Sequence, residues 1–163
     1  MAELKTERIV IDLPDDLSIG MTRRFRAPKS LVFEAHVKPE HLKNWWGRTG
    51  STLSVCEIDA RTGGKWRFVE RQADGEEYGF HGEFREVTPP DRIVWTFEFE
   101  GMPGNVAVET VTFTEADGVT TLRTISVADS KEARDAMLQS GMEEGANESL
   151  DRLEVLLGTL SAK

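Results

Sequence analysis

A succession of strand-like runs separated by short turns constrains the fold of this chain more than any other feature. The runs lie near residues 52–60, 65–72, 77–87, 92–100, 106–115 and 119–128. Turns rich in Gly, Pro and Asp separate them, for example at 62–64 and 116–118. Connections this short join neighbouring antiparallel strands and leave no room for crossover helices. We therefore predict an antiparallel meander.

The strand-like runs carry aromatic side chains on one face. Ile93, Trp95, Phe97 and Phe99 occupy alternate positions, so they share one side of a strand. The same period of two groups Trp66 with Phe68, Val111 with Phe113, and Phe80 with Phe84. A sheet with such a ring-rich face needs a second layer that covers it.

Residues 130–160 have the pattern of a single long helix that provides this cover. Asp129 or Ser130 is a suitable N-cap, and at about 1.5 Å per residue the helix would extend roughly 40 Å. Its C-terminal half places a stripe of leucines toward the core. In its N-terminal half Gly141 and Gly145 follow Met137 on the same stripe, so the side chains that face the sheet become small.

Two interpretations of these glycines remain open. Each Gly inside a helix costs about 1 kcal/mol relative to Ala, so two of them on one stripe require a reason. Either they let the helix pack closely on the sheet, or they leave a void, lined by Met137 and Met142, in which a ligand sits. A packed Gly and an open one look the same in a sequence.

The N-terminal part of the chain supplies the remaining elements. A strand is predicted over 19–26, followed by short helices over 29–36 and from Pro39 to about Trp46. Residues 8–13 alternate weakly and could add an edge strand, but Pro14 ends the run, so 1–18 is treated as an accessory segment. The expected fold is α+β, with a curved seven-stranded antiparallel sheet around a long C-terminal helix, in one domain over 19–163.

Several segments resemble one protein family. They are RRFRAP (23–28), WWG (45–47), GGKWRF (63–68), RIVWTF (92–97), SGMEEG (140–145) and ESLDRL (148–153). Together they resemble the proteins related to the activator of the 90-kDa heat-shock chaperone ATPase, within the START-like, or SRPBCC, superfamily. The resemblance implies the helix-grip fold, with a deep cavity between the sheet and the long helix. Members of the superfamily bind lipids, hormones, polyketides or aromatic compounds, and a few catalyse cyclisation or dehydration.

Composition and charge narrow the classes of function. The length of 163 residues suits one domain, and a formal net charge of -9 argues against nucleic acid or an anionic membrane as partner. Cys56 is the single cysteine, so neither an intramolecular disulfide nor a cysteine-based zinc site can form. The sequence has no apolar run typical of a signal peptide or a membrane span, and we expect a cytoplasmic protein.

Catalytic motifs are sparse. The sequence has no G-x-S-x-G, P-loop, H-E-x-x-H or Rossmann glycine pattern, and we expect neither a metal nor a cofactor. Glu70 and Glu109 follow the inner phase of their strands. They either orient a ligand and act as acid or base, or reach water where the strands end, which we favour. His81 is a third candidate, although its phase directs it to solvent or the sheet rim.

Three functions fit these observations. The first is the binding of a small apolar or aromatic molecule between the sheet and the helix. The second is an enzyme of the cyclase or dehydratase type that uses Glu70, Glu109 or His81. The third is interaction with a chaperone, which would require an exposed apolar patch, and a homodimer through a free sheet edge also remains open.

The predicted ligand site combines the ring-rich face with the N-terminal half of the long helix. One of Trp45 and Trp46 is expected in the core and the other at the cavity mouth, because Trp supplies a large apolar area with a single donor. The predicted ligand-binding residues are Trp46, Trp66, Phe68, Phe84, Trp95, Phe97, Val111, Phe113, Met137, Gly141, Met142 and Gly145.

Overall fold

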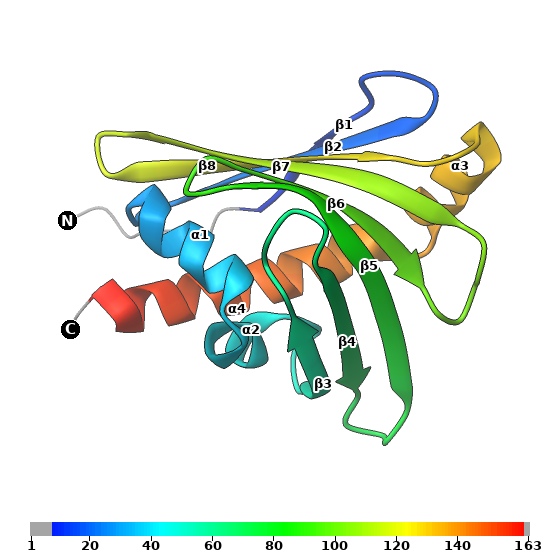
Figure 1. The fold of residues 1–163 in the computed structure, drawn as a ribbon, viewed down its shortest axis with the longest axis horizontal. Coiled ribbons are helices and arrows are strands. Elements are labelled where there is room, and N and C mark those ends of the chain that lie inside the picture. The colour runs from blue at the N-terminus through cyan, green and yellow to red at the C-terminus, as the bar shows by residue number, and fades with distance from the viewer. Residues whose placement is uncertain (1–7, 162–163) are drawn as a thin grey trace.

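The computed structural model describes residues 8–161, which form one antiparallel sheet of eight strands and four helices (Figure 1). The strands are β1 (Val10–Asp12), β2 (Ser18–Phe25), β3 (Thr52–Ile58), β4 (Lys65–Arg71), β5 (Glu77–Thr88), β6 (Arg92–Phe99), β7 (Val106–Ala116) and β8 (Val119–Val127). The helices are α1 (Lys29–Val37), α2 (Pro39–Trp45), α3 (Lys131–Gln139) and α4 (Met142–Ser161). Figure 1 shows the sheet curving around α4.

The strand order is β1-β2-β8-β7-β6-β5-β4-β3. From β3 to β8 each strand pairs with the next one along the chain, so the predicted meander is confirmed. β2 then pairs with β8, which brings the start of the domain beside its last strand. The register places Trp95 of β6 opposite Glu109 of β7, and Glu109 opposite Ser126 of β8.

The sheet has eight strands, so the predicted number of seven was wrong. The additional strand is β1, in which Val10 lies opposite Thr22 of β2. Pro14 ends this strand but does not prevent it, because an edge strand needs partners on one side only. Just before β1, the Ile9 amide donates to Asn147 Oδ1 of α4 at 2.9 Å. Part of the segment treated as accessory therefore contacts both layers.

The predicted single C-terminal helix is also corrected, because the structure contains two helices. α3 begins after Ser130, whose Oγ accepts a hydrogen bond from the Ala133 amide at 3.0 Å. It ends before Ser140 and Gly141, and Gly141 has a φ of 84°. This left-handed conformation is far less costly for Gly than for other residues, so the chain turns there before α4 starts.

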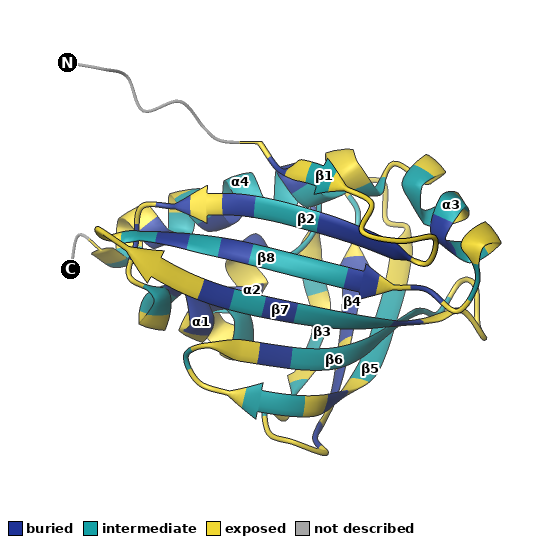
Figure 2. Ribbon diagram, turned by 90° about the horizontal axis from the view of Figure 1, so that it is seen from above, coloured by how far each residue is buried: buried dark blue, intermediate teal, exposed yellow. Residues whose placement is uncertain are grey.

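The protein core lies where α1, α2 and the C-terminal half of α4 meet the sheet. Leu153 and Leu157 of α4 are buried there with Phe25, Val32 and Phe113. In Figure 2 buried segments alternate mainly with partly buried ones along β2, β7 and β8, as expected for strands with one more deeply covered face. Burial of apolar area at this end supplies the main stabilisation of the fold.

Candidate ligand cavity

A cavity of about 1090 Å³ lies between the concave face of the sheet and helices α3 and α4. Its wall takes residues from β2, β6, β7 and β8, from both C-terminal helices, and from the segment between α2 and β3. Cavities that hold small organic molecules measure roughly 300–1,000 Å³. The space is therefore large enough for a ligand with several rings.

Small side chains on the helices leave this space unfilled. Gly145, Ala146 and Ser149 of α4 line the cavity, as does Ala133 of α3. The break at Gly141 also contributes, because it prevents α3 and α4 from forming one continuous rod. The glycine interpretation that predicted a void matches this geometry at Gly145, whereas Gly141 is a turn residue.

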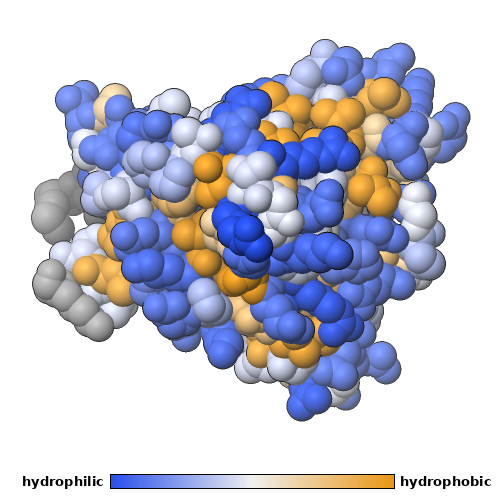
Figure 3. Space-filling view, in the orientation of Figure 1, coloured by the Kyte–Doolittle hydropathy of each residue, from blue (hydrophilic) through white to orange (hydrophobic). Residues whose placement is uncertain are grey.

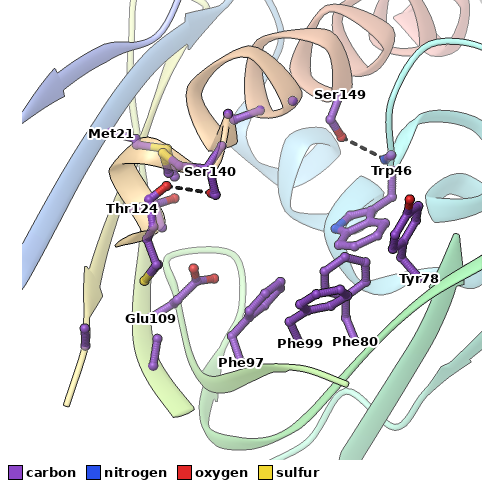
Figure 4. A pocket seen from close by; sticks show the side chains of 18 of the residues that line it. Met21, Trp46, Tyr78, Phe80, Phe97, Phe99, Glu109, Thr124, Ser140 and Ser149 are labelled. Atoms are coloured by element: carbon purple, nitrogen blue, oxygen red, sulfur yellow. Dashed lines mark hydrogen bonds between the residues drawn. The ribbon is translucent and has the colours of Figure 1, made fainter. Parts of the chain in front are cut away.

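An aromatic wall faces these small residues. Its rings are Trp46, Tyr78, Phe80, Trp95, Phe97 and Phe99. Figure 4 shows Phe80, Phe97 and Phe99 together with Trp46 on the side of the cavity away from α3. Phe80 links the wall, since its ring centroid lies 5.1 Å from Trp46, 5.5 Å from Phe97 and 5.2 Å from Phe99. These separations are typical of favourable aromatic pairs.

The predicted ligand-binding residues fall into two groups. Eight of them line the cavity: Trp46, Trp95, Phe97, Val111, Met137, Gly141, Met142 and Gly145. The other four, Trp66, Phe68, Phe84 and Phe113, are not in the wall and are buried in the core behind it. Trp66 supports the wall from there, because its ring stacks on Trp95 with centroids 4.2 Å apart.

Glu109 is the carboxyl group that projects into the cavity from β7 (Figure 4). Its Oε1 accepts a hydrogen bond from the Trp95 indole Nε1 at 2.8 Å. Burial raises the pKa of Glu109, and the Trp95 indole and the Ser126 hydroxyl only partly oppose this shift. The Ser126 hydroxyl lies near enough to influence the carboxyl, although its geometry does not satisfy a full hydrogen bond. The expectation that Glu109 reaches water at the strand end does not match this position.

Glu70 lines the same cavity but is committed to structural contacts. It is buried, and its Oε2 accepts hydrogen bonds from the Arg48 backbone amide at 2.8 Å and from Gln72 Nε2 at 3.0 Å. These bonds hold the segment that follows α2. Glu70 therefore positions one side of the cavity, and its Oε2 is already engaged by two donors of the protein.

His81 lies outside the cavity wall. Its Nδ1 is 2.9 Å from Glu100 Oε2 and its Nε2 is 3.3 Å from Glu98 Oε1, and its side chain is 44% exposed. The alternation of side chains along its strand had predicted that His81 faces solvent or the sheet rim, and this prediction agrees with its position. Glu100 also pairs with Arg67, which lowers the pKa of Glu100 to about 2. His81 thus belongs to a surface ion cluster.

His36 is a further wall residue that the predicted set omitted. It lies in the last turn of α1, where its ring packs between Trp45 and Phe113 with centroids 5.0 and 5.2 Å away. Burial lowers the pKa of His36 to about 4, against a smaller opposing effect of the Val32 carbonyl. The imidazole is therefore neutral at neutral pH.

Polar side chains of α4 fix the segment between α2 and β3, and sequence reasoning missed this role. Ser149 Oγ accepts from the Gly47 amide at 3.1 Å and donates to the Trp45 carbonyl at 3.2 Å. Arg152 Nη1 donates to the carbonyls of Gly47 and Arg48 at 3.1 and 2.9 Å. These bonds hold Trp46 in the wall. The spacing of Ser149 and Arg152 by three residues, on one helix face, was the available signal.

Tyr78, Phe80 and Phe99 are further wall residues that the predicted set omitted. Phe80 and Phe99 had been assigned to the ring-rich face by the period of two. Which rings of that face reach the cavity depends on where α4 crosses the sheet, which periodicity does not specify. Tyr78 lies directly opposite Glu70 in the pairing of β4 with β5, near the cavity mouth.

The described residues hold neither a metal cluster nor a membrane helix. Among residues 8–161, no group of three or more His, Cys, Asp or Glu side chains has the arrangement of a metal site. None of the helices in that range is long and apolar enough to cross a membrane.

Comparisons with known proteins agree with the architecture. The family model described as Activator of Hsp90 ATPase homolog 1-like protein matches residues 26–158. A solved structure from Rhodobacter sphaeroides has a TM-score of 0.88 at 24% identity and covers 94% of this chain and 99% of its own. One from Mycobacterium smegmatis has a TM-score of 0.81 at 28% identity and covers 93% and 96%. None of the curated proteins matches the sequence.

A more distant structure is that of a chaperone activator. It is an HSP90 activator from Plasmodium falciparum, with a TM-score of 0.64 and 23% identity, covering 87% of this chain and 96% of its own. At this identity the likeness shows a shared fold.

Proposed function

Because this chain belongs to the Activator of Hsp90 ATPase homolog 1-like family and encloses an aromatic cavity, we propose that it binds a small hydrophobic or aromatic molecule. The single observation that carries the proposal is the cavity of about 1090 Å³ between the aromatic wall and the small residues of α4. An apolar molecule placed there would gain about 25 cal/mol of free energy for each Å² of apolar surface that it buries, before the costs of association are subtracted.

Filling the space with a large side chain tests the proposal. The probe is N-phenyl-1-naphthylamine, whose fluorescence rises in apolar surroundings, and we expect saturable binding with a Kd on the order of micromolar. Ala146→Phe places a ring into the cavity from α4, so we expect it to weaken probe binding at least tenfold. Val155→Phe is the matched control, because Val155 lies on the same helix and is 73% exposed.

The proposal also predicts a stability change. A probe present at a hundred times its Kd stabilises the folded protein by about 2.7 kcal/mol, which raises Tm. Ala133→Phe on α3 provides a second blocking variant should Ala146→Phe not fold. If wild type binds no probe, or if both blocking variants bind it as well as Val155→Phe does, the cavity is not a ligand site.

A chaperone partner is the alternative suggested by the family and by the Plasmodium activator. Such a partner would require a continuous apolar surface. On the face shown in Figure 3, hydrophobic side chains form separate patches with hydrophilic ones between them. The cavity therefore supports ligand binding more directly than this face supports docking, and an Hsp90 ATPase assay with and without the protein compares the two.

A catalytic role would depend on Glu109. A carboxyl group with a raised pKa inside a cavity is suited to act as a general acid. The other two candidates contribute less, because Glu70 is held by hydrogen bonds and His81 lies on the outer face. Binding is accordingly the first proposal, and turnover by a cyclase or dehydratase mechanism is the second.

A further inference from the structure

Glu109 is a carboxyl group in the part of the cavity between β7 and α3, where the hydroxyl groups of Thr124 and Ser140 also line the space (Figure 4). Its neighbours across the sheet are Trp95 on β6 and Ser126 on β8, and Met137 of α3 lines the same space. Oε1 is engaged by the Trp95 indole at 2.8 Å. The Ser126 hydroxyl also lies near the carboxyl group, and within residues 8–161 no Lys, Arg or His is among the groups that influence its pKa. A buried carboxyl without a cation is costly unless it is protonated or meets a partner.

Seven other ionisable side chains line the cavity. They are Arg23, His36, Arg48, Glu70, Tyr78, Asp129 and Glu132. Arg23 pairs with Asp151 at 2.7 Å, and Arg48 pairs with Glu148 at 3.6 Å. The pKa of His36 of about 4 keeps the imidazole neutral above pH 5. Burial raises the pKa of Glu109 and the Trp95 indole and Ser126 hydroxyl oppose this shift, so no charged side chain is among its causes.

From this geometry we propose that Glu109 is the polar anchor of the cavity, and that its carboxylic acid donates a hydrogen bond to the carbonyl oxygen of a neutral aromatic ligand. The inference rests on the proposed function and adds the chemical class of the ligand. The ligand's rings lie between the aromatic wall and the small residues of α4, near Phe97 and Phe99. Its carbonyl points to β7.

A neutral carbonyl suits this position better than an ammonium group. A carbonyl is satisfied by one donor, and one carboxylic acid proton supplies it. An ammonium group brings three donors, whereas Glu109 is one carboxyl group, with one oxygen already accepting from Trp95, in a wall that is mainly aromatic and aliphatic. The ammonium group would also lose its hydration on entering the cavity. Protonated Glu109 therefore selects an uncharged acceptor.

A matched pair of probes isolates this hydrogen bond. In 2-acetylnaphthalene a carbonyl stands where 2-isopropenylnaphthalene has a carbon–carbon double bond, so the two differ in acceptor capacity and little in shape. Their affinities are measured by displacement of N-phenyl-1-naphthylamine, and the ratio between them is the readout. A net hydrogen bond corresponds to a preference for the carbonyl of about fivefold.

Two substitutions at Glu109 give opposite expectations. Glu109→Gln retains a donor for the ligand and an acceptor for Trp95, so it retains the preference for 2-acetylnaphthalene. Glu109→Met removes both, so the preference falls by about fivefold or more while 2-isopropenylnaphthalene binds as before. The preference of the wild type falls as pH rises through the pKa of Glu109, because the ionised group no longer donates, whereas that of Glu109→Gln stays constant.

The outcomes separate this inference from the proposed function. If both probes bind with a ratio that is the same in wild type and Glu109→Gln at every pH from 5 to 9, and the same in Glu109→Met, the anchor is refuted and the cavity remains a ligand site. If 2-(2-naphthyl)ethylamine is preferred over both probes and this preference is lost in Glu109→Gln, the ligand is a cation and the inference is wrong. If no probe binds the wild type, the proposed function fails as well. Should Glu109→Met not fold, the pH profiles of wild type and Glu109→Gln decide alone.

Discussion

The two halves of α4 face the same sheet in different ways. In the C-terminal half, Leu153 and Leu157 are buried against rings and aliphatic side chains of the core. In the N-terminal half, Gly145 and Ser149 border a cavity of about 1090 Å³. One half thus supplies packing that stabilises the fold, while the other leaves apolar surface without protein partners. The difference shows that this architecture can support a ligand site with only part of the space between its layers filled.

The boundary between the halves is a layer that serves both. Leu42, Trp45, Val111 and Leu122 belong to the buried core and also line the cavity. The Trp45 indole donates to the Ala35 carbonyl at 2.9 Å, which fixes one part of this layer on α1 and α2. A rigid layer of this kind allows the cavity to persist without collapse of the surrounding side chains.

Truncation of one large side chain in each half should give the largest difference in the free energy of unfolding. Leu153→Ala removes a fully buried side chain from the filled half, and we expect the free energy of unfolding to fall by about 3 kcal/mol. Met137→Ala acts on a side chain that already borders open space, so we expect a loss below about 1 kcal/mol. Urea unfolding at pH 7 measures both. Equal losses would mean that the cavity half is packed as tightly as the core.

The filled half could largely be predicted from the sequence, because its signals are local. Alternation placed Val111 and Phe113 on the covered face, and the leucine stripe placed Leu153 toward the sheet. The order from β3 to β8 followed from turn lengths, whereas the pairing of β2 with β8 was not predicted. These features depend on neighbouring residues along the chain, so periodicity and turn chemistry are sufficient to find them.

The open half could be predicted only in part, because its decisive features are tertiary. Gly141 and Gly145 have the same spacing as two helical residues, and only the φ of 84° at Gly141 separates a turn from a helix. Glu70 and Glu109 shared the same strand phase, yet Glu70 is bound by the segment that contains Arg48, whereas Glu109 accepts from Trp95 inside the cavity. Curvature of the sheet likewise decided that Phe99 reaches the cavity while Phe84 does not.

The boundary layer contains a titratable group that can test whether water reaches it. The pKa of His36 is about 4 in the folded protein, below its value of 6.5 in an unfolded chain. The unfolded state therefore takes up a proton as pH falls below 6.5, whereas the folded state does not until about pH 4. The contribution of His36 to the free energy of unfolding is fully present above pH 6.5 and is lost as pH falls toward 4. About 2 kcal/mol of it is lost between pH 7 and pH 5.

Urea unfolding of wild type and His36→Gln at both pH values isolates this effect. We expect the loss between pH 7 and pH 5 to be about 2 kcal/mol smaller in His36→Gln, because the other ionisable groups are common to both proteins. The difference between the two losses is independent of any general destabilisation by the substitution. The same loss in both proteins would show that His36 is hydrated, and that water enters the cavity as far as this layer.

The smallest expected effect concerns Gly141 and Gly145, which lie one turn apart at the start of the open half. A Cβ at either position would meet Arg48 Nη2 at 3.4 Å, so the steric surroundings are alike and the backbone differs. Gly141→Ala forces a side chain into a left-handed conformation, and we expect a loss of about 1 kcal/mol. Gly145→Ala adds a helix former inside α4, and we expect a gain of up to about 1 kcal/mol.

Thermal unfolding of both variants compares them directly, since the free energies should change in opposite directions. A loss of stability in both would mean that contact with Arg48 outweighs the backbone preference. A gain in both would mean that Gly141 accepts a helical conformation, and that α3 and α4 can form the continuous helix expected from the sequence. The cavity would then owe less of its size to the break, and the contrast between the two halves of α4 would rest on side-chain volume alone.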